Sequence, residues 1–400
     1  MANNNENKVL NVPHLRFPEF TEEWVTKSIN DLAVVIGGGT PDTTVKSYWD
    51  GEIQWFTPSE IGKNKYVDSS LRTITEVGLN NSSAKLLPPN TILLSSRATI
   101  GECSLSLREC ATNQGFQCLV SKKCNVDFLY YLIQTKKKDL IRKSCGSTFL
   151  EISANEVRKI QVSVPSDVEQ QKIAELLSLI DERIATQNKI IEKLQSLIKG
   201  IVVSHYSTTA HIIKVRIREL GEAYSTMVMS KEQLTNDGNL CIFYGELFTL
   251  YGCVIDKVKS RTSLEKVSST LSHGRDLLFP ASTTVDAVSL IAPSALMQKG
   301  IILGGDMFGI KVSEAYNPIY LSYYFNYIAN KRLAKYAKGT TIIHLHYNEI
   351  ANVAIELPNI EEQDKIVSTI LEYSAKLSIE ETILEKLFDL KQYLLKQLFI

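Results

Sequence analysis

The chain has 400 residues, and its 44% hydrophobic and 22% charged content is typical of a folded globular protein, which excludes a disordered chain. No apolar run reaches the roughly 18 residues that a membrane helix needs, so we expect a cytoplasmic protein with no membrane contact. The 44 basic and 44 acidic side chains cancel, which disfavours a protein that binds nucleic acid strongly by itself, because Lys and Arg supply most of the non-specific affinity.

The seven cysteines also fit an intracellular protein. They form an odd-numbered set without a Cys-x-x-Cys pair, which is the pattern of reduced thiols and not of a disulfide or zinc framework. We interpret them as small core residues, and we predict no metal bound by this chain.

The first region, residues 1–165, contains no recognisable catalytic motif. Gly37-Gly38-Gly39-Thr40 lacks the Lys that a phosphate-binding loop needs, so a turn is the better interpretation. Pro41-Asp42 and Glu52-Ile53-Gln54 resemble a metal-dependent nuclease pattern, but Gln54 stands where that pattern has Lys. A base methyltransferase would need a glycine-rich cofactor loop and an Asn/Asp-Pro-Pro-aromatic motif, and neither is present. We therefore predict a non-catalytic chain.

Loops of the first region carry side chains suited to reading bases, because Arg and Lys can bind guanine while Asn and Gln can bind adenine. These candidates are Lys63, Lys65, Ser95, Ser96, Arg97, Asn113 and Gln114. The alternative interpretation is that each belongs to an ordinary surface loop.

A basic cluster precedes a hydroxyl-rich turn near the end of the first region, and the same arrangement recurs later in the chain. The first cluster is Lys136, Lys137, Lys138, Arg142 and Lys143, ahead of Gly146-Ser147-Thr148; the second is Lys331, Arg332, Lys335 and Lys338, ahead of Gly339-Thr340-Thr341. We predict contacts to DNA phosphates from both clusters and from the turn residues Ser147, Thr148, Thr340 and Thr341. The alternatives are a solvated helix face and a simple hairpin before the next strand.

A long helix is predicted from residue 166. Pro165 ends a strand-like run at 160–164, and Ser166 and Glu169 then supply an N-cap oxygen and a Glu at the third helical position. The helix carries an apolar seam with 4-3 spacing, typical of a coiled coil. The seam residues are Ile173, Leu177, Ile180, Ile184, Gln187, Ile191, Leu194, Ile198 and Ile201.

The second region, residues 206–357, offers weaker counterparts of the first region's loops. Arg275, in Ser272-His273-Gly274-Arg275, is a candidate base contact, and Thr283-Thr284 forms another turn. His344 and His346 have metal-ligand chemistry, but without a third ligand nearby we interpret them as strand residues.

A second long helix is predicted after Pro358. Asn359 and Glu362 repeat the helix start, and a polar residue occupies the same seam position as in the first helix, where it can fix the register: Gln187 there and Glu380 here. The second seam comprises Ile366, Ile370, Tyr373, Leu377, Glu380, Leu384, Leu387, Lys391 and Leu394.

An internal repeat sets the architecture. A shift of 193 residues carries Gly146 onto Gly339, Pro165 onto Pro358 and Glu169-Gln170 onto Glu362-Gln363 without a gap. We predict an α+β fold with two mixed, β-rich variable domains, residues 1–165 and 206–357, separated by helices at 166–205 and 358–400. The second helix must run back along the first, so the pair is antiparallel with a pseudo-twofold axis. At about 1.5 Å per residue, about 38 residues span roughly 55 Å, the length of roughly 16 base pairs.

The chain resembles the specificity subunits of type I restriction–modification enzymes over essentially its whole length. The most specific marks are Asn11–Phe20 with Trp24, Ala111–Phe116, and the two Pro…Glu-Gln-x-Lys-Ile helix starts. The second copy departs from the pattern because it has no Asn-Gln-Gly.

The resemblance implies that each variable domain is a target-recognition domain for one half of a bipartite double-stranded DNA target. It implies that two methyltransferase subunits dock on the helices and that restriction/translocase subunits join them. S-adenosylmethionine, ATP and Mg would then belong to those partners, and this chain would bind no cofactor.

Two other function classes stay open. The same frame could serve a solitary DNA-binding regulator or anti-restriction factor, which would bind DNA strongly alone. A stand-alone nuclease with an unrecognised site would cut DNA in the presence of a metal. Neutral charge and the missing motifs disfavour both.

Overall fold

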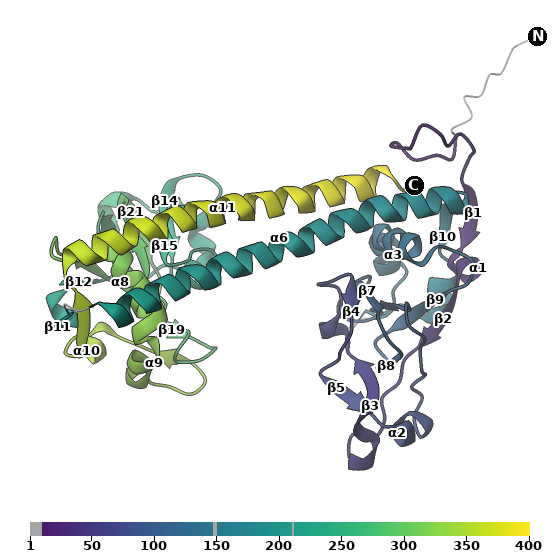
Figure 1. Ribbon diagram of the computed structural model, residues 1–400, viewed down its shortest axis with the longest axis horizontal. Coiled ribbons are helices and arrows are strands. Elements are labelled where there is room, and N and C mark those ends of the chain that lie inside the picture. The colour runs from purple at the N-terminus through teal and green to yellow at the C-terminus, as the bar shows by residue number, and fades with distance from the viewer. Residues whose placement is uncertain (1–9, 147–149, 210–211) are drawn as a thin grey trace, which may run out of the picture. The chain divides into compact units, whose positions relative to one another are not determined.

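The computed structural model describes residues 10–146, 150–209 and 212–400 (Figure 1). The chain forms two compact units, one comprising Met1–Asn188 with Thr382–Ile400 and the other Lys189–Glu381. Each unit therefore holds one variable region together with parts of both long helices. Among the described residues, no helix is both long enough and apolar enough to cross a membrane.

The first unit is built on a five-stranded and a three-stranded sheet. The five-stranded sheet has the order β2 (Ala33–Gly37), β9 (Gln117–Ser121), β6 (Ile92–Leu94), β7 (Cys103–Ser106), β4 (Tyr66–Val67). The three-stranded sheet has the order β5 (Arg72–Ile74), β3 (Trp49–Phe56), β8 (Cys110–Thr112). A separate antiparallel pair joins β1 (Val25–Ser28) to β10 (Gln161–Val164). The helices are α1 (Ile29–Leu32), α2 (Glu76–Asn80), α3 (Val126–Thr135), α4 (Lys137–Arg142) and α5 (Ala154–Arg158).

The second unit also has two main sheets, each of five strands. Its first sheet has the order β12 (Gly221–Ser225), β22 (Met307–Val312), β18 (Asp276–Pro280), β20 (Ser294–Leu296), β15 (Val254–Ile255). Its second has the order β13 (Leu234–Thr235), β16 (Ser260–Thr262), β14 (Asn239–Phe243), β21 (Lys299–Gly304), β17 (Leu271–His273). The two-stranded pairs are β11 (Ile212–Arg216) with β24 (Ala354–Pro358), and β19 (Ser282–Thr283) with β23 (Ile343–His344). The helices are α7 (Glu246–Thr249), α8 (Pro318–Tyr324), α9 (Asn330–Leu333) and α10 (Tyr347–Ile350).

The first sheets of the two units share one topology, although the variable regions diverge in sequence. In each first sheet the edge pair is parallel, β4 with β7 and β15 with β20, and the next pair is antiparallel. In each second sheet the corresponding parallel pair is β3 with β8 and β14 with β21. The predicted α+β fold with a duplicated variable domain is confirmed.

Two long helices, α6 (Asp167–Thr208) and α11 (Ile360–Gln397), run antiparallel within each unit. In the first unit Ile173 and Leu177, near the start of α6, share a core with Leu394 and Leu398 at the end of the chain. In the second unit the end of α6 shares a core with the start of α11. The predicted antiparallel pairing is confirmed.

The predicted seam residues are buried or half-buried along both helices, and Gln187 is among the most buried of them. The seam departs from the prediction at its end. Val202 is 1% exposed while Ile201 is only half-buried, because the contact line steps by four residues from Ile198. A straight helix drifts in this way relative to a strict seven-residue repeat.

The predicted N-cap is confirmed at the start of α11, whereas the predicted role of Glu169 at the start of α6 is wrong. The side chain of Asn359 caps α11 by accepting from the backbone N–H of Glu362 at 3.0 Å. The Glu169 carboxylate instead accepts two hydrogen bonds from Arg16, at 2.7 and 2.8 Å, and one from the indole of Trp24. Glu169 therefore ties the N-terminal segment to α6.

A buried glutamine at each helix start fastens the variable region to the helix. Gln170 accepts from the backbone N–H of Asn125, which caps α3, and donates to the carbonyl of Pro165. Gln363 does the same with the backbone N–H of Asn317, which caps α8, and with the preceding proline carbonyl. The repeated Glu-Gln pair in the sequence thus has a structural cause in both units.

Five of the seven cysteines are buried, as the prediction of small core residues requires. Cys253 is half-buried and Cys145 is exposed, so for Cys145 that prediction is wrong. Cys145 lies at the base of the turn that follows α4, on the surface of its unit.

Candidate nucleic-acid interface

In the first unit, the residues that flank the turn after the basic cluster pair with each other and with the loop after β6. Cys145 and Glu151 form an isolated antiparallel bridge, which closes the hairpin. Arg97 bridges to Glu151 from the other side, and the backbone N–H of Ile152 donates to the carbonyl of Ser96 at 3.1 Å. Ser147 and Thr148 lie outside the described residues, so their predicted phosphate contacts stay predictions.

The second unit builds the same hairpin. Lys338 and His344 form the closing bridge, and His344 pairs with Ser282 between β23 and β19. The backbone N–H of Leu345 donates to the carbonyl of Ala281 at 2.9 Å. Position by position, Ser282 corresponds to Arg97, and His344 corresponds to Glu151. The hairpin interpretation of the second turn is thus confirmed, and Thr340 and Thr341 are exposed at its tip; for the first turn only the flanking bridge is described.

The loop that carries Arg97 is held by its own side chains. Ser95 is buried and donates from its hydroxyl to the carbonyl of Arg97 at 2.8 Å, while Thr99 donates to the Ser95 hydroxyl. Ala98 has a φ of 53°, a left-handed conformation that is unusual outside glycine. Ser95 and Ser96 are both fully buried, so their hydroxyls are not exposed at the surface.

Arg97 itself projects from this loop and forms an ion pair with Glu151 at 2.9 Å. The side chains are 42% and 38% exposed, so the pair lies at the surface. Beside this loop, Asn113 is half-buried and accepts from the backbone N–H of Gly115, which fixes the Ala111–Phe116 turn. Gln114 is exposed, and its amide oxygen accepts from the Thr40 hydroxyl.

The first basic cluster is divided between structural and exposed side chains. Lys136 donates to the carbonyl of Ile400, and burial lowers its pKa. Lys137 is ion-paired with Glu102, and Arg142 with Asp139 on its own helix. The latter two pairs are at least one-third exposed, which leaves both cations near the surface; Lys138 is also exposed and Lys143 is half-buried.

The second basic cluster is more exposed. Lys331, Arg332 and Lys335 are exposed on α9 and the turn after it, and Arg332 contacts the hydroxyl of Tyr324. Lys338 is ion-paired with Glu349 at 2.9 Å but remains 77% exposed. These side chains flank the Lys338–His344 hairpin, as the sequence predicted.

The interpretation of Arg275 as a base contact does not fit its environment. Its guanidinium donates to the carbonyls of Ser313 and Tyr316, at 3.1 and 2.7 Å, and lies 3.5 Å from the carboxylate of Glu314. Arg275 therefore fastens the segment after β22, and sequence alone could not show that its donors are occupied.

Lys65 is likewise part of an internal network. Its side chain is 6% exposed, and its ammonium contacts the Asp127 carboxylate at 2.6 Å and the Ser178 hydroxyl at 2.7 Å. The ammonium also lies 4.9 Å from the ring centre of Tyr131, which is a cation–π contact. We therefore leave Lys65 out of the DNA-contact set. Lys63 is exposed, so its predicted contact stays open.

The same network joins the variable region to both long helices of the first unit. The Tyr131 hydroxyl donates to Asp181 on α6 at 2.7 Å, and Lys391 on α11 binds the same carboxylate at 2.7 Å. In the second unit the corresponding contact is neutral, between the hydroxyls of Tyr323 and Ser374 at 3.1 Å. These contacts could not be predicted from sequence, because Lys391 appears there only as a polar residue in an apolar seam.

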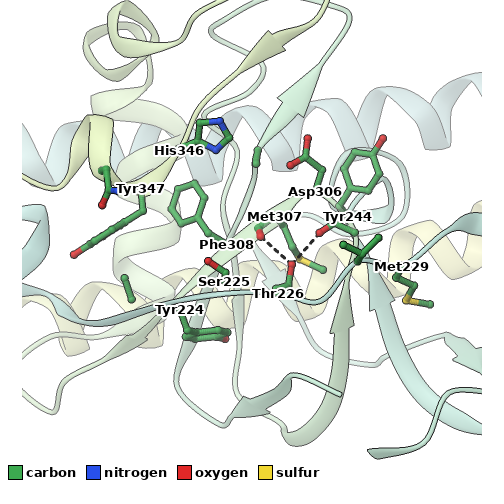
Figure 2. Close-up of a pocket in the computed structure, with 15 residues that line it drawn as sticks. Tyr224, Ser225, Thr226, Met229, Tyr244, Asp306, Met307, Phe308, His346 and Tyr347 are labelled. Atoms are coloured by element: carbon green, nitrogen blue, oxygen red, sulfur yellow. Dashed lines mark hydrogen bonds between the residues drawn. The ribbon is translucent and has the colours of Figure 1, made fainter. Parts of the chain in front are cut away.

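An open pocket of about 930 Å³ in the second unit was also missed (Figure 2). Aromatic and sulfur side chains line it together with a few polar groups, and Thr226 braces its floor by donating to the carbonyls of Gly305 and Met307. Its lining includes Tyr224, Met229, Tyr244, Asp306, Phe308, His346, Tyr347 and Asn348. These residues come from strands and loops far apart in sequence, so no local motif indicates the pocket. Among the described residues, no cluster of three metal-ligating side chains is found.

One family matches the chain twice, over residues 21–196 and 213–388, and its description is type I restriction modification DNA specificity domain. A stretch of 181 residues is 40% identical to the type I restriction enzyme MjaIX specificity subunit of Methanocaldococcus jannaschii, covering 43% of this chain and 42% of that protein. A stretch of 175 residues is 31% identical to the EcoR124I/EcoR124II specificity subunit of Escherichia coli, covering 42% and 43%. Each of these matches spans less than half of the relative's length.

Two solved structures share the fold over nearly the whole chain. The S subunit of a type I restriction–modification system from M. genitalium has a TM-score of 0.56 at 15% identity, covering 97% of this chain and 99% of that one. A chain from a study of complex assembly and conformational transition of the type I R-M system has a TM-score of 0.55 at 16% identity, covering 94% and 97%. At such identities the likeness extends to the fold alone.

Proposed function

Because this chain belongs to the family of type I restriction-modification DNA specificity domains, we propose that it is a DNA-reading subunit in which each variable domain reads one half of a bipartite double-stranded target. The observation that carries this proposal is the duplicated hairpin. Both units build it with the same bridges and place exposed basic side chains beside it, but the residues at its base differ between them.

Phosphate and base contacts would come from different parts of this surface. Lys138, Arg142, Lys331, Lys335 and Lys338 are exposed and suited to phosphates, which position a protein on DNA without reading sequence. The loops beside them carry the groups that can reach base edges in the major groove. In the second unit the aromatic pocket adds ring faces and the Asp306 carboxylate to this surface.

The chemistry of the complex would reside in partner subunits. The chain shows neither a cofactor-binding motif nor a nuclease motif, and its neutral charge supports binding to DNA in company with other subunits. We propose that two methyltransferase subunits dock on the long helices and that restriction/translocase subunits join the complex. S-adenosylmethionine, ATP and Mg would then be bound by those partners, within a cytoplasmic complex.

The test is reconstitution of the full chain with its cognate methyltransferase subunit. We expect a complex with two methyltransferase subunits per chain, measured by mass in solution, that methylates one bipartite motif in a genomic library. Methylation that proceeds equally well without this chain would refute the proposal. Tight DNA binding by the chain alone would instead favour the solitary regulator, and metal-dependent cutting would favour a nuclease.

A further inference from the structure

We propose that Arg97 reads a guanine in the half-site of the first variable domain and that Glu151 positions it. This inference rests on the proposed function and deepens it, because it assigns one base pair to one pair of side chains. Arg binds the O6 and N7 atoms of guanine through two parallel hydrogen bonds, and a carboxylate can accept from the N4 of the paired cytosine. Arg97 and Glu151 together therefore match the major-groove edge of one G·C pair.

Both units share the backbone arrangement of the hairpin and the loop beside it, but the side chains at the positions of Arg97 and Glu151 differ between them. Arg97 and Ser282 occupy equivalent places beside the hairpin, and so do Glu151 and His344. Ser282 is 8% exposed, and its side chain is too short to project from the surface. The Arg97 side chain is 42% exposed. A position at which a shared frame carries different side chains is where two domains acquire different targets.

The loop fixes the backbone of Arg97 and leaves its side chain free to exchange partners. The Ser95 hydroxyl holds the carbonyl of Arg97, and the backbone N–H of Gly101 donates to the carbonyl of Ser95. Ala98 keeps a left-handed φ of 53°, a conformation that such bracing must maintain. Because the backbone of Arg97 is already fixed, less conformational entropy is lost when its side chain binds DNA.

The ion pair between Arg97 and Glu151 is weak enough to be exchanged for a contact with DNA. An exposed arginine–carboxylate pair contributes little to stability, so DNA can replace Glu151 as a partner at small cost. The guanidinium is also incompletely bonded, since its Nε atom is buried without a hydrogen-bond partner among the described residues. Arg97 is thus held in position by Glu151 without being fully satisfied by it.

The test measures the methylated motif for variants of the full chain, each assembled with the cognate methyltransferase subunit and given a library of DNA with randomised half-sites. The wild-type complex is expected to require a G·C pair in the half-site of the first domain. Arg97→Ala should lower discrimination at that pair roughly fivefold to a hundredfold and leave the other half-site unchanged. Arg97→Lys should keep part of the preference, and Glu151→Gln should weaken discrimination at the same pair only.

Arg108 provides the matched control, because its exposed pair with Asp68 at 2.6 Å lies in the same domain. Arg108→Ala should leave the motif unchanged. The inference is overturned if folded Arg97→Ala keeps the wild-type motif, or if it lowers methylation equally at every sequence. If Arg97→Ala does not fold, an undiminished guanine requirement in Glu151→Gln overturns it. A wild-type complex with no sequence preference would refute the proposed function itself, a different result from a motif that Arg97 does not affect.

Discussion

The buried glutamine at the start of α6 offers the most direct test of how the variable region is joined to the helix. Gln170 is 3% exposed. Its amide oxygen accepts from the backbone N–H of Asn125 at 3.0 Å, and its amide nitrogen donates to the carbonyl of Pro165 at 3.0 Å. Gln170→Ala removes both partners at once and leaves the buried Pro165 carbonyl and the partly buried Asn125 N–H without these hydrogen bonds.

The expected cost follows from those two groups. A buried backbone group left unpaired costs about 1–3 kcal/mol and the partly buried Asn125 N–H costs about 1 kcal/mol, so the free energy of unfolding of the first unit should fall by about 2–4 kcal/mol. For a unit of this size each kcal/mol lowers the melting temperature by about 2–4 °C, which gives a drop of about 5–15 °C. Gln363→Ala should have a similar effect on the second unit, because Gln363 makes the equivalent two bonds.

Calorimetry would give the melting temperatures, and hydrogen exchange would show which unit loosens. Exchange should accelerate at the start of α3 in Gln170→Ala and at the start of α8 in Gln363→Ala. Gln171, the exposed neighbour of Gln170, is the control, and Gln171→Ala should change stability by less than about 0.5 kcal/mol. Equal effects of Gln170→Ala and Gln171→Ala would refute the reasoning.

Three further predictions concern buried charges and thiols. Arg16→Met leaves the 1%-exposed carboxylate of Glu169 without its ion-pair partner and should destabilise the first unit by about 3–5 kcal/mol in chemical denaturation; Glu169→Gln in the same background should restore part of the loss. Asp181→Ala strands an ammonium group that is 14% exposed and should weaken first-unit hydrogen-exchange protection, whereas a mutation of an exposed helix carboxylate should not. Burial raises the pKa of Cys110 to about 12, so in the unfolded chain this thiol ionises first, and its contribution to stability should be lost as the pH rises from about 9 towards 12. Iodoacetamide at pH 8 should therefore label Cys145 rapidly and Cys110 only after unfolding; equal rates would contradict the model of a buried thiol.

The repeat and the long helices could be predicted from sequence because they depend on local or periodic signals. The 193-residue shift placed Pro165 on Pro358, and in the structure Pro165 follows a strand, Pro358 ends one, and both precede long helices. The predicted seam identified the buried helix face, including the burial of the polar Gln187. Its error at Ile201 arose because a fixed 4-3 rule ignores the drift of a real helix.

The candidate site could be predicted only in part, because residue type does not show which donors are already bonded. Arg97 and Arg275 look alike in sequence, since each lies in a short polar segment that contains serine, Ser95-Ser96-Arg97 and Ser272-His273-Gly274-Arg275. In the structure Arg97 is exposed and pairs with a single carboxylate, whereas Arg275 donates its hydrogen bonds to backbone carbonyls. The predicted DNA contact of Lys65 is disfavoured for the same reason, because its ammonium is already bonded to Asp127 and Ser178. Such commitments depend on contacts between residues distant in the chain.

The backbone bridges of the hairpins and the exposed side chains beside them have separate roles, which explains how such a chain can acquire new targets without refolding. The closing bridges, Cys145 with Glu151 and Lys338 with His344, are backbone contacts, so they survive changes of side chain at their own positions. The side chains at these positions and at Arg97 lie at the surface, where substitutions usually change stability by less than about 0.5 kcal/mol. The joints to the helices are the opposite case, since Gln170 and Gln363 are buried and each holds two backbone groups. Selection for a new sequence can therefore act on the exposed positions, while the buried joints stay fixed because any change there costs several kcal/mol.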